Sequence, residues 1–148
     1  MRALQARPDT RGQTSREIKA LKDLTEAKCF CTPKFRAWKH ENQDRNDWVP
    51  GGFLDYIVME KLEGRTLSPE LIDSLSNEQQ QRLRTAFKRS YIECLNHNFV
   101  NLDQGARNLI WNEEKGICYI IDWETWCRAT SSYDWNDDEY CSWDLELS

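Results

Sequence analysis

The sequence predicts one α+β domain, because helical and strand patterns alternate along its 148 residues with no linker-like segment between them. Residues 53–59 form an apolar run of aromatic and β-branched side chains, which is typical of a strand. Residues 76–79 match a capping box, and the apolar side chains that follow recur on one helical face. Residues 109–111 and 118–121 favour two further strands, joined as a hairpin.

Local signals also place a helix and a strand in the first part of the chain. A possible capping box formed by Thr14 and Glu17 opens a helix over about 15–28. Pro33 follows, where a helix cannot continue. Residues 35–38 favour a short strand.

The second half is organised around the helix that opens at the capping box. Residues 67–75 indicate a short helix, and the capped helix is expected to run to about residue 96. Residues 99–107 are expected to be a loop. We therefore expect a domain over 15–126 and an acidic, Trp-rich C-terminal tail over 127–148, which packs on the domain or trails from it.

Composition and charge exclude several classes of partner. The net charge of −5 disfavours nucleic acid and anionic membranes, since both are bound by clustered Lys and Arg. No run approaches the length of a membrane span, and the N-terminus lacks an apolar signal-peptide core, so a cytoplasmic protein is expected. Seven Trp residues favour a packed globule over a disordered chain.

The spacing of the six cysteines does not predict a zinc site. Cys29 and Cys31 form a C-x-C pair, the other four are scattered, and no C-x2-C pair occurs. Neither His40 nor His97 lies near a useful partner in the sequence. In a cytoplasmic protein these cysteines are expected to be reduced thiols.

The candidate functional residues are three polar residues, Asp103, Asn108 and Asp122. An Asp followed five residues later by Asn, then a hairpin that ends in a second Asp, suits transfer of a phosphoryl group. One carboxylate would receive the proton of an acceptor hydroxyl. An amide oxygen and the second carboxylate would hold the magnesium that bridges the nucleotide phosphates.

With these motifs in order, the chain resembles the protein-kinase-like superfamily, in particular the fungal kinase-like proteins and the phosphotransferases related to aminoglycoside and choline kinases. The resemblance rests on residues 49–64, 103–108, 109–111 and 120–124, and covers about 15–126. Each segment is moderately specific, but four in the right order and spacing are a much stronger signal.

The resemblance implies roles for particular residues. Asp103 would be the catalytic base, while Asn108 and Asp122 would bind Mg²⁺. Glu17 would match the helix glutamate that pairs with a nucleotide-binding lysine. ATP would contact the backbone of a hinge formed by Met59, Glu60, Lys61 and Leu62.

Departures from the family pattern are equally informative. The residues before Glu17 include no Lys and no G-x-G-x-x-G, so the resemblance implies mostly the large lobe with a truncated small lobe. Asn101 and Leu102 replace the usual His-Arg before the base, and Asp122 is followed by Trp-Glu without a Gly. Phosphorylation of peptides is therefore not expected.

Three interpretations of function remain open on the sequence. The chain is a kinase-like protein descended from an ATP- and Mg²⁺-dependent phosphotransferase and weak or inactive alone. Alternatively, it is a non-catalytic pseudokinase that binds a protein partner over the truncated lobe. It is otherwise a fragment of a longer small-molecule kinase.

Overall fold

The structure is a computed structural model that describes residues 12–147. Its helices are α1 (Gly12–Glu26), α2 (Pro69–Asp73), α3 (Asn77–Asn96) and α4 (Asp138–Ser142), with a 3₁₀ turn at Ala106–Asn108. Its strands are β1 (Phe35–Asn42), β2 (Phe53–Met59), β3 (Arg65–Thr66), β4 (Phe99–Asn101), β5 (Leu109–Asn112), β6 (Ile117–Ile120) and β7 (Trp126–Arg128). In the described residues the strands form three antiparallel sheets, ordered β1-β2, β3-β5-β6 and β4-β7.

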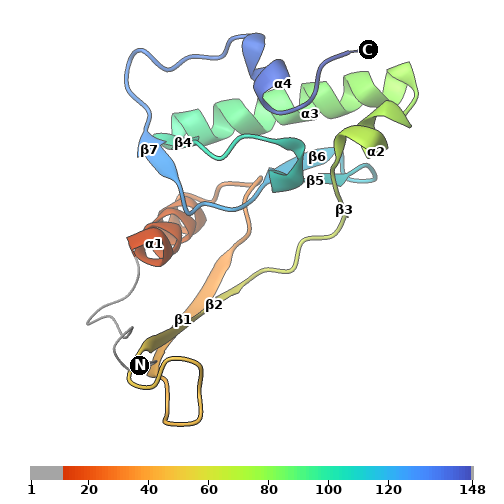
Figure 1. Ribbon diagram of the computed structural model, residues 1–148. Coiled ribbons are helices and arrows are strands. Elements are labelled where there is room, and N and C mark those ends of the chain that lie inside the picture. The colour runs from red at the N-terminus through yellow and green to blue at the C-terminus, as the bar shows by residue number, and fades with distance from the viewer. Residues whose placement is uncertain (1–11, 148) are drawn as a thin grey trace.

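Helix α3 lies between the sheet that contains β5 and β6 and the C-terminal segment (Figure 1). It begins with the expected capping box: the Ser76 hydroxyl accepts a hydrogen bond from the Gln79 amide, and the Gln79 side chain accepts one from the Ser76 amide. Its apolar face is buried, as the helical periodicity predicted. That face includes Leu83, Ala86, Phe87, Tyr91 and Cys94.

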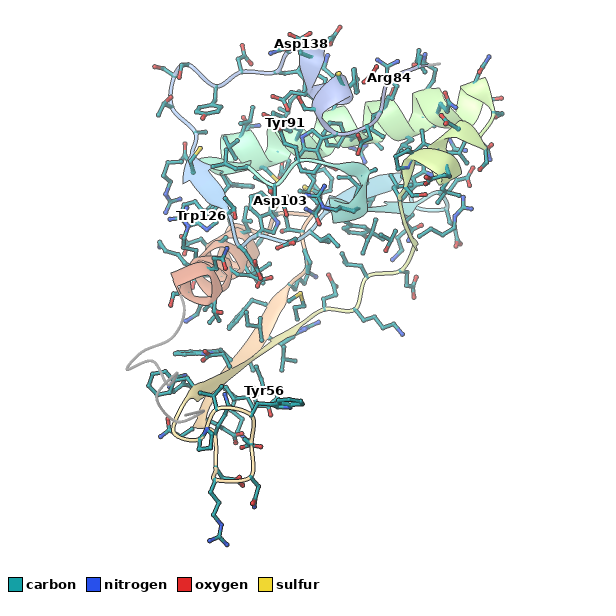
Figure 2. The ribbon with its side chains drawn as sticks, viewed as in Figure 1. Tyr56, Arg84, Tyr91, Asp103, Trp126 and Asp138 are labelled. Atoms are coloured by element: carbon teal, nitrogen blue, oxygen red, sulfur yellow. The ribbon has the colours of Figure 1, made fainter. Side chains whose placement is uncertain are left out.

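The C-terminal segment packs against the outer side of α3. Trp143 and Leu145 are buried in the same core cluster as the residues of α3. The ring of Trp143 lies 5.4 Å from that of Phe87, and the Arg84 guanidinium stacks 4.0 Å from the Tyr140 ring. Figure 2 shows Arg84 close to α4.

The hairpin of β1 and β2 projects away from the rest of the molecule (Figure 1). Strand β2 covers the predicted residues, but β1 continues four residues beyond the predicted end at residue 38. The extension has a simple cause, since the ladder pairs β1 as far as Asn42 with Phe53. Pairing with a partner strand extends a polar stretch that has little strand signal of its own.

Residues 99–107 contain more regular structure than the expected loop. Residues 99–101 form β4, which pairs with β7 in the C-terminal segment. Strands of three residues are too short to show a two-residue period, so their partner defines them rather than their pattern. Across residues 12–147, no helix is both long and apolar enough to cross a membrane.

Candidate active site

The loop after β4 holds the Asp103 carboxylate from both sides. One carboxylate oxygen, Oδ1, accepts a hydrogen bond from the Arg107 guanidinium. The other, Oδ2, accepts one from the Asn108 side-chain amide at 2.9 Å, and the same amide donates to the Asp103 carbonyl at 2.9 Å. Because Asn108 uses its nitrogen on Asp103, its Oδ1 oxygen points away from that carboxylate. The Asp103–Asn108 spacing thus brings the two side chains together, as expected.

The turn between these two residues depends on a glycine and on a distant aspartate. Gly105 has a φ of 145°, which residues with a Cβ rarely adopt. The next amide, that of Ala106, donates to Oδ2 of Asp144 at 2.9 Å. The C-terminal segment therefore stabilises the loop that carries Asp103.

Asn101 joins the Asp103 loop to the segment that carries Asp122. Its Nδ2 donates to the carbonyls of Ile121 at 3.2 Å and Asp122 at 2.9 Å, and its Oδ1 accepts from the Asp103 amide at 2.9 Å. The Asn101 side chain is buried, so these hydrogen bonds are shielded from water. The sequence showed Asn101 only as a replacement for the usual His, and its bridging role was missed.

Asp122 lies in a strained turn directly after β6. Its φ is 61°, a left-handed conformation that is uncommon for a residue with a side chain. On one side the Ile121 amide donates to the Asn108 carbonyl at 2.9 Å, and on the other the buried Trp123 indole donates to the Ile120 carbonyl at 3.0 Å. These contacts hold the turn and fix Asp122 next to the Asn108 loop.

A pocket of about 380 Å³ lies between the predicted hinge and Asp122. The pocket has three kinds of wall. The residues of the predicted hinge that line it are Met59, Glu60 and Leu62. The apolar wall is formed by Pro33, Ile110 and Ile121, and the acidic wall by Glu17, Asp122 and Glu124. The volume and the mixture of apolar walls with a few polar groups are typical of small-molecule sites.

Three of the four predicted hinge residues line this pocket. Lys61 is exposed and lies outside its lining. The Glu60 amide donates to the Lys34 carbonyl at 2.8 Å, which anchors the hinge to the segment before β1.

Glu17 reaches the acidic side of the pocket from α1. Burial, and then the nearby carboxylates of Glu124 and Asp122, together raise the pKa of its carboxyl to about 7. Glu17 therefore meets negative charge where the resemblance implied a lysine. Glu124 was not predicted from the sequence as part of this cluster, although it lies two residues after Asp122.

The comparisons with known proteins identify the fold but no family. No family model matches the sequence, and no curated protein sequence matches it. Two crystal structures of WbdD are similar in fold. The first, at 2.2 Å resolution, has a TM-score of 0.57 at 22% identity over 82% of this chain. The second, WbdD with the kinase inhibitor LY294002, has a TM-score of 0.55 at 21% identity over 82% of this chain.

The chain spans about a quarter of the length of these WbdD chains, 24% of one and 25% of the other. The similarity supports a kinase-like fold for the mixed α and β architecture described above. It agrees with the kinase-like fold that the sequence motifs predicted.

Proposed function

We propose that this chain is a kinase-like protein, descended from ATP-dependent phosphotransferases, that binds a magnesium nucleotide in the pocket between residues 59–62 and Asp122. One observation carries the proposal: a single pocket has the predicted hinge on one side and Asp122 on the other. The adenine of ATP would lie against Met59 and Leu62, where the walls are apolar. Its phosphates would extend toward Asp122.

Asp122 lines the pocket, whereas Asn108 and Asp103 lie outside its lining, and the donor atoms of Asn108 and Asp122 suit Mg²⁺. The Asn108 amide oxygen and the Asp122 carboxylate are hard oxygen ligands, the kind that Mg²⁺ prefers beside phosphate oxygens. Bound there, magnesium would neutralise the charge of the phosphates. The Asp103 carboxylate, held by Arg107 and Asn108, would accept the proton of an acceptor hydroxyl.

Two features of the sequence and the pocket explain why the phosphotransfer activity of this chain alone should be low. The sequence before Glu17 contains no Gly-rich loop and no lysine to cover the phosphates. Removing one such group from a preorganised site costs about 10²–10³ in rate. Glu17 and Glu124 add negative charge where a cation is needed, so a nucleotide would bind only together with Mg²⁺.

A second candidate function, that of a non-catalytic interaction module, is favoured by the surface of the β1–β2 hairpin. Trp38, Tyr56 and Val58 are 47%, 46% and 51% exposed, although large apolar side chains usually pack in a core. Figure 2 shows Tyr56 far out on the hairpin, away from Asp103. We interpret this hairpin and α1 as a truncated small lobe, which a protein partner or a further segment of a longer kinase would cover.

A thermal-shift titration with ATP and Mg²⁺ tests the nucleotide site. At about 100 times its dissociation constant, a ligand stabilises the folded state by ~2.7 kcal/mol, which raises the melting temperature by several degrees. We expect this shift to require Mg²⁺ and to be lost in Asp122→Asn. The matched control is Asp73→Asn, at the exposed end of α2, which should retain the shift.

The outcome separates the two candidate functions. A magnesium-dependent shift that only Asp122→Asn abolishes supports the nucleotide site and justifies a screen of small-molecule acceptors. If millimolar ATP leaves the melting temperature of a cooperatively melting protein unchanged, the nucleotide site is refuted and the interaction module remains.

A further inference from the structure

Three buried cysteines from distant parts of the chain meet beneath α3. Cys29 and Cys31 lie in the turn that follows α1, and Cys94 lies on the buried face of α3. The Sγ atoms of Cys29 and Cys31 are 3.5 Å apart, and those of Cys31 and Cys94 are 3.8 Å apart. All three are free thiols. The sequence spacing had not predicted this cluster, since 63 residues separate Cys31 from Cys94.

The distances between the sulfur atoms match those around a tetrahedral zinc ion. With a Zn–S bond of about 2.3 Å, two thiolates on one tetrahedral ion lie ~3.8 Å apart. A disulfide would need about 2.05 Å. The distances between the sulfur atoms are therefore close to those between two ligands of a tetrahedral zinc ion.

A fourth donor of the right type lies beside the cluster. His97 follows Cys94 by three residues, so both project from one side of the last turn of α3. A ring nitrogen of His97 lies within 4.8 Å of Cys29 Sγ, in a group with Glu93 and outside the group of the three cysteine sulfurs. The imidazole would therefore have to turn toward Cys31 and Cys94 to complete the metal shell. The Glu93 carboxylate, whose Oε1 lies 3.0 Å from His97 Nε2, is the type of group that orients metal-binding histidines.

The burial of the three sulfur atoms favours a compensating cation. Cys29, Cys31 and Cys94 are 3%, 0% and 2% exposed. Thiolates enclosed to this degree are costly unless a positive charge compensates them, and a bound zinc ion would supply that charge.

We propose that Cys29, Cys31, Cys94 and His97 bind one zinc ion. Three sulfurs and one nitrogen fill a tetrahedral shell and leave no open position, so the site is structural rather than catalytic. Zinc would displace the thiol protons and link the end of α1 to the end of α3. The link would hold in place the helix that carries Glu17, and it does not depend on whether the pocket binds a nucleotide.

Cobalt titration of the reduced full chain tests the site directly, because Co²⁺ reports its ligands by absorption. We expect one equivalent of Co²⁺ to give a thiolate-to-cobalt charge-transfer band and the intense visible bands of tetrahedral cobalt. Stoichiometric Zn²⁺ should then bleach both. Weak visible bands typical of six-coordinate cobalt, or no saturation at one equivalent, would overturn the proposal.

Two variants and one control identify the ligands. Cys94→Ser should lower zinc affinity at least ~100-fold, because loss of a direct ligand exceeds the 10–100-fold cost of losing an outer partner. Cys118→Ser removes another buried cysteine, on β6, and should leave the affinity unchanged. His97→Ala alters a partly exposed side chain and should keep the fold. It should retain the charge-transfer band but weaken the tetrahedral visible bands.

Two further results would contradict the assignment. Zinc affinity in folded His97→Ala equal to that of the unaltered protein would remove His97 from the site. A metal-free protein with a Cys29–Cys31 disulfide, two hydrogens lighter by mass spectrometry and unable to bind Zn²⁺ after reduction, would show a redox pair instead.

Discussion

Replacing Glu17 by glutamine should stabilise the protein above pH 7 and leave its stability unchanged near pH 4.5. The reason is the raised pKa of the Glu17 carboxyl, about 7 in the folded protein against an ordinary value of 4.5. Between these two values the folded state holds a proton that the unfolded state has lost. The free energy of unfolding therefore falls as the pH rises through this interval.

The size of the effect follows from the pKa. A rise from 4.5 to about 7 corresponds to roughly 3 kcal/mol, at about 1.4 kcal/mol for each pKa unit. Glu17 is only half-buried, and water screens part of this cost. We therefore expect Glu17→Gln to raise the free energy of unfolding by about 1–2 kcal/mol at pH 8.

Urea unfolding at pH 8 and pH 4.5 measures the difference. Glu17→Gln should shift the midpoint to higher urea at pH 8 only, with an unchanged slope. Glu114→Gln, in the exposed turn between β5 and β6, is the matched control and should change stability by less than ~0.5 kcal/mol at either pH. Equal effects of Glu17→Gln at both pH values, or a loss of stability at pH 8, would refute the reasoning.

Two other substitutions test how the fold is held together. Asn101→Ala should cost about 2–3 kcal/mol, because it leaves the carbonyls of Ile121 and Asp122 without their side-chain donor, and thermal unfolding would show it as a lower melting temperature. An unchanged melting temperature would mean that water replaces the amide. Trp143→Ala should cost about 3–5 kcal/mol by chemical denaturation, since its ring is completely buried, whereas Trp48→Ala, 85% exposed, should cost under ~0.5 kcal/mol. Similar costs for the two would show that the C-terminal segment does not pack as described.

Elements with strong local signals could be predicted from the sequence. The capping box at Ser76 and the apolar period of the following helix placed the start of α3 within one residue. Strand β2 covers the predicted residues 53–59, because its apolar run differs sharply from the turn before it. In both cases the information lies within a few neighbouring residues.

Elements defined by distant partners could not be predicted in the same way. Strands β4 and β7 have three residues each and exist because they pair across the domain. Helix α4 has five residues, which are too few to show a helical period in the sequence. Their existence depends on the tertiary fold.

In the candidate active site, too, local contacts could be predicted from the sequence and distant contacts could not. The placement of Asp103 and Asn108 on one loop is confirmed, because five residues of chain keep them close. Asn101 and Asp144 were missed because their hydrogen-bond partners are about 20 and 38 residues away in the sequence. Whether Asp103 acts as a base and Asp122 as a metal ligand stays a prediction.

The contacts at the start of α1 bear on how such a protein could be regulated. The Trp126 indole donates to the Arg16 carbonyl at 2.9 Å, and the Arg16 guanidinium lies 4.4 Å from the centre of the Trp126 ring. At the other end of the helix, the Phe35 amide donates to the Thr25 hydroxyl at 2.9 Å.

Helix α1 is held by contacts at both ends, so an outward movement of the whole helix would break both sets of contacts at once. A ligand can shift such an equilibrium only by as much as it binds one state better than the other. An effector would therefore have to bind strongly to an outward state to populate it. The contacts at both ends of α1 therefore oppose an outward movement of this helix.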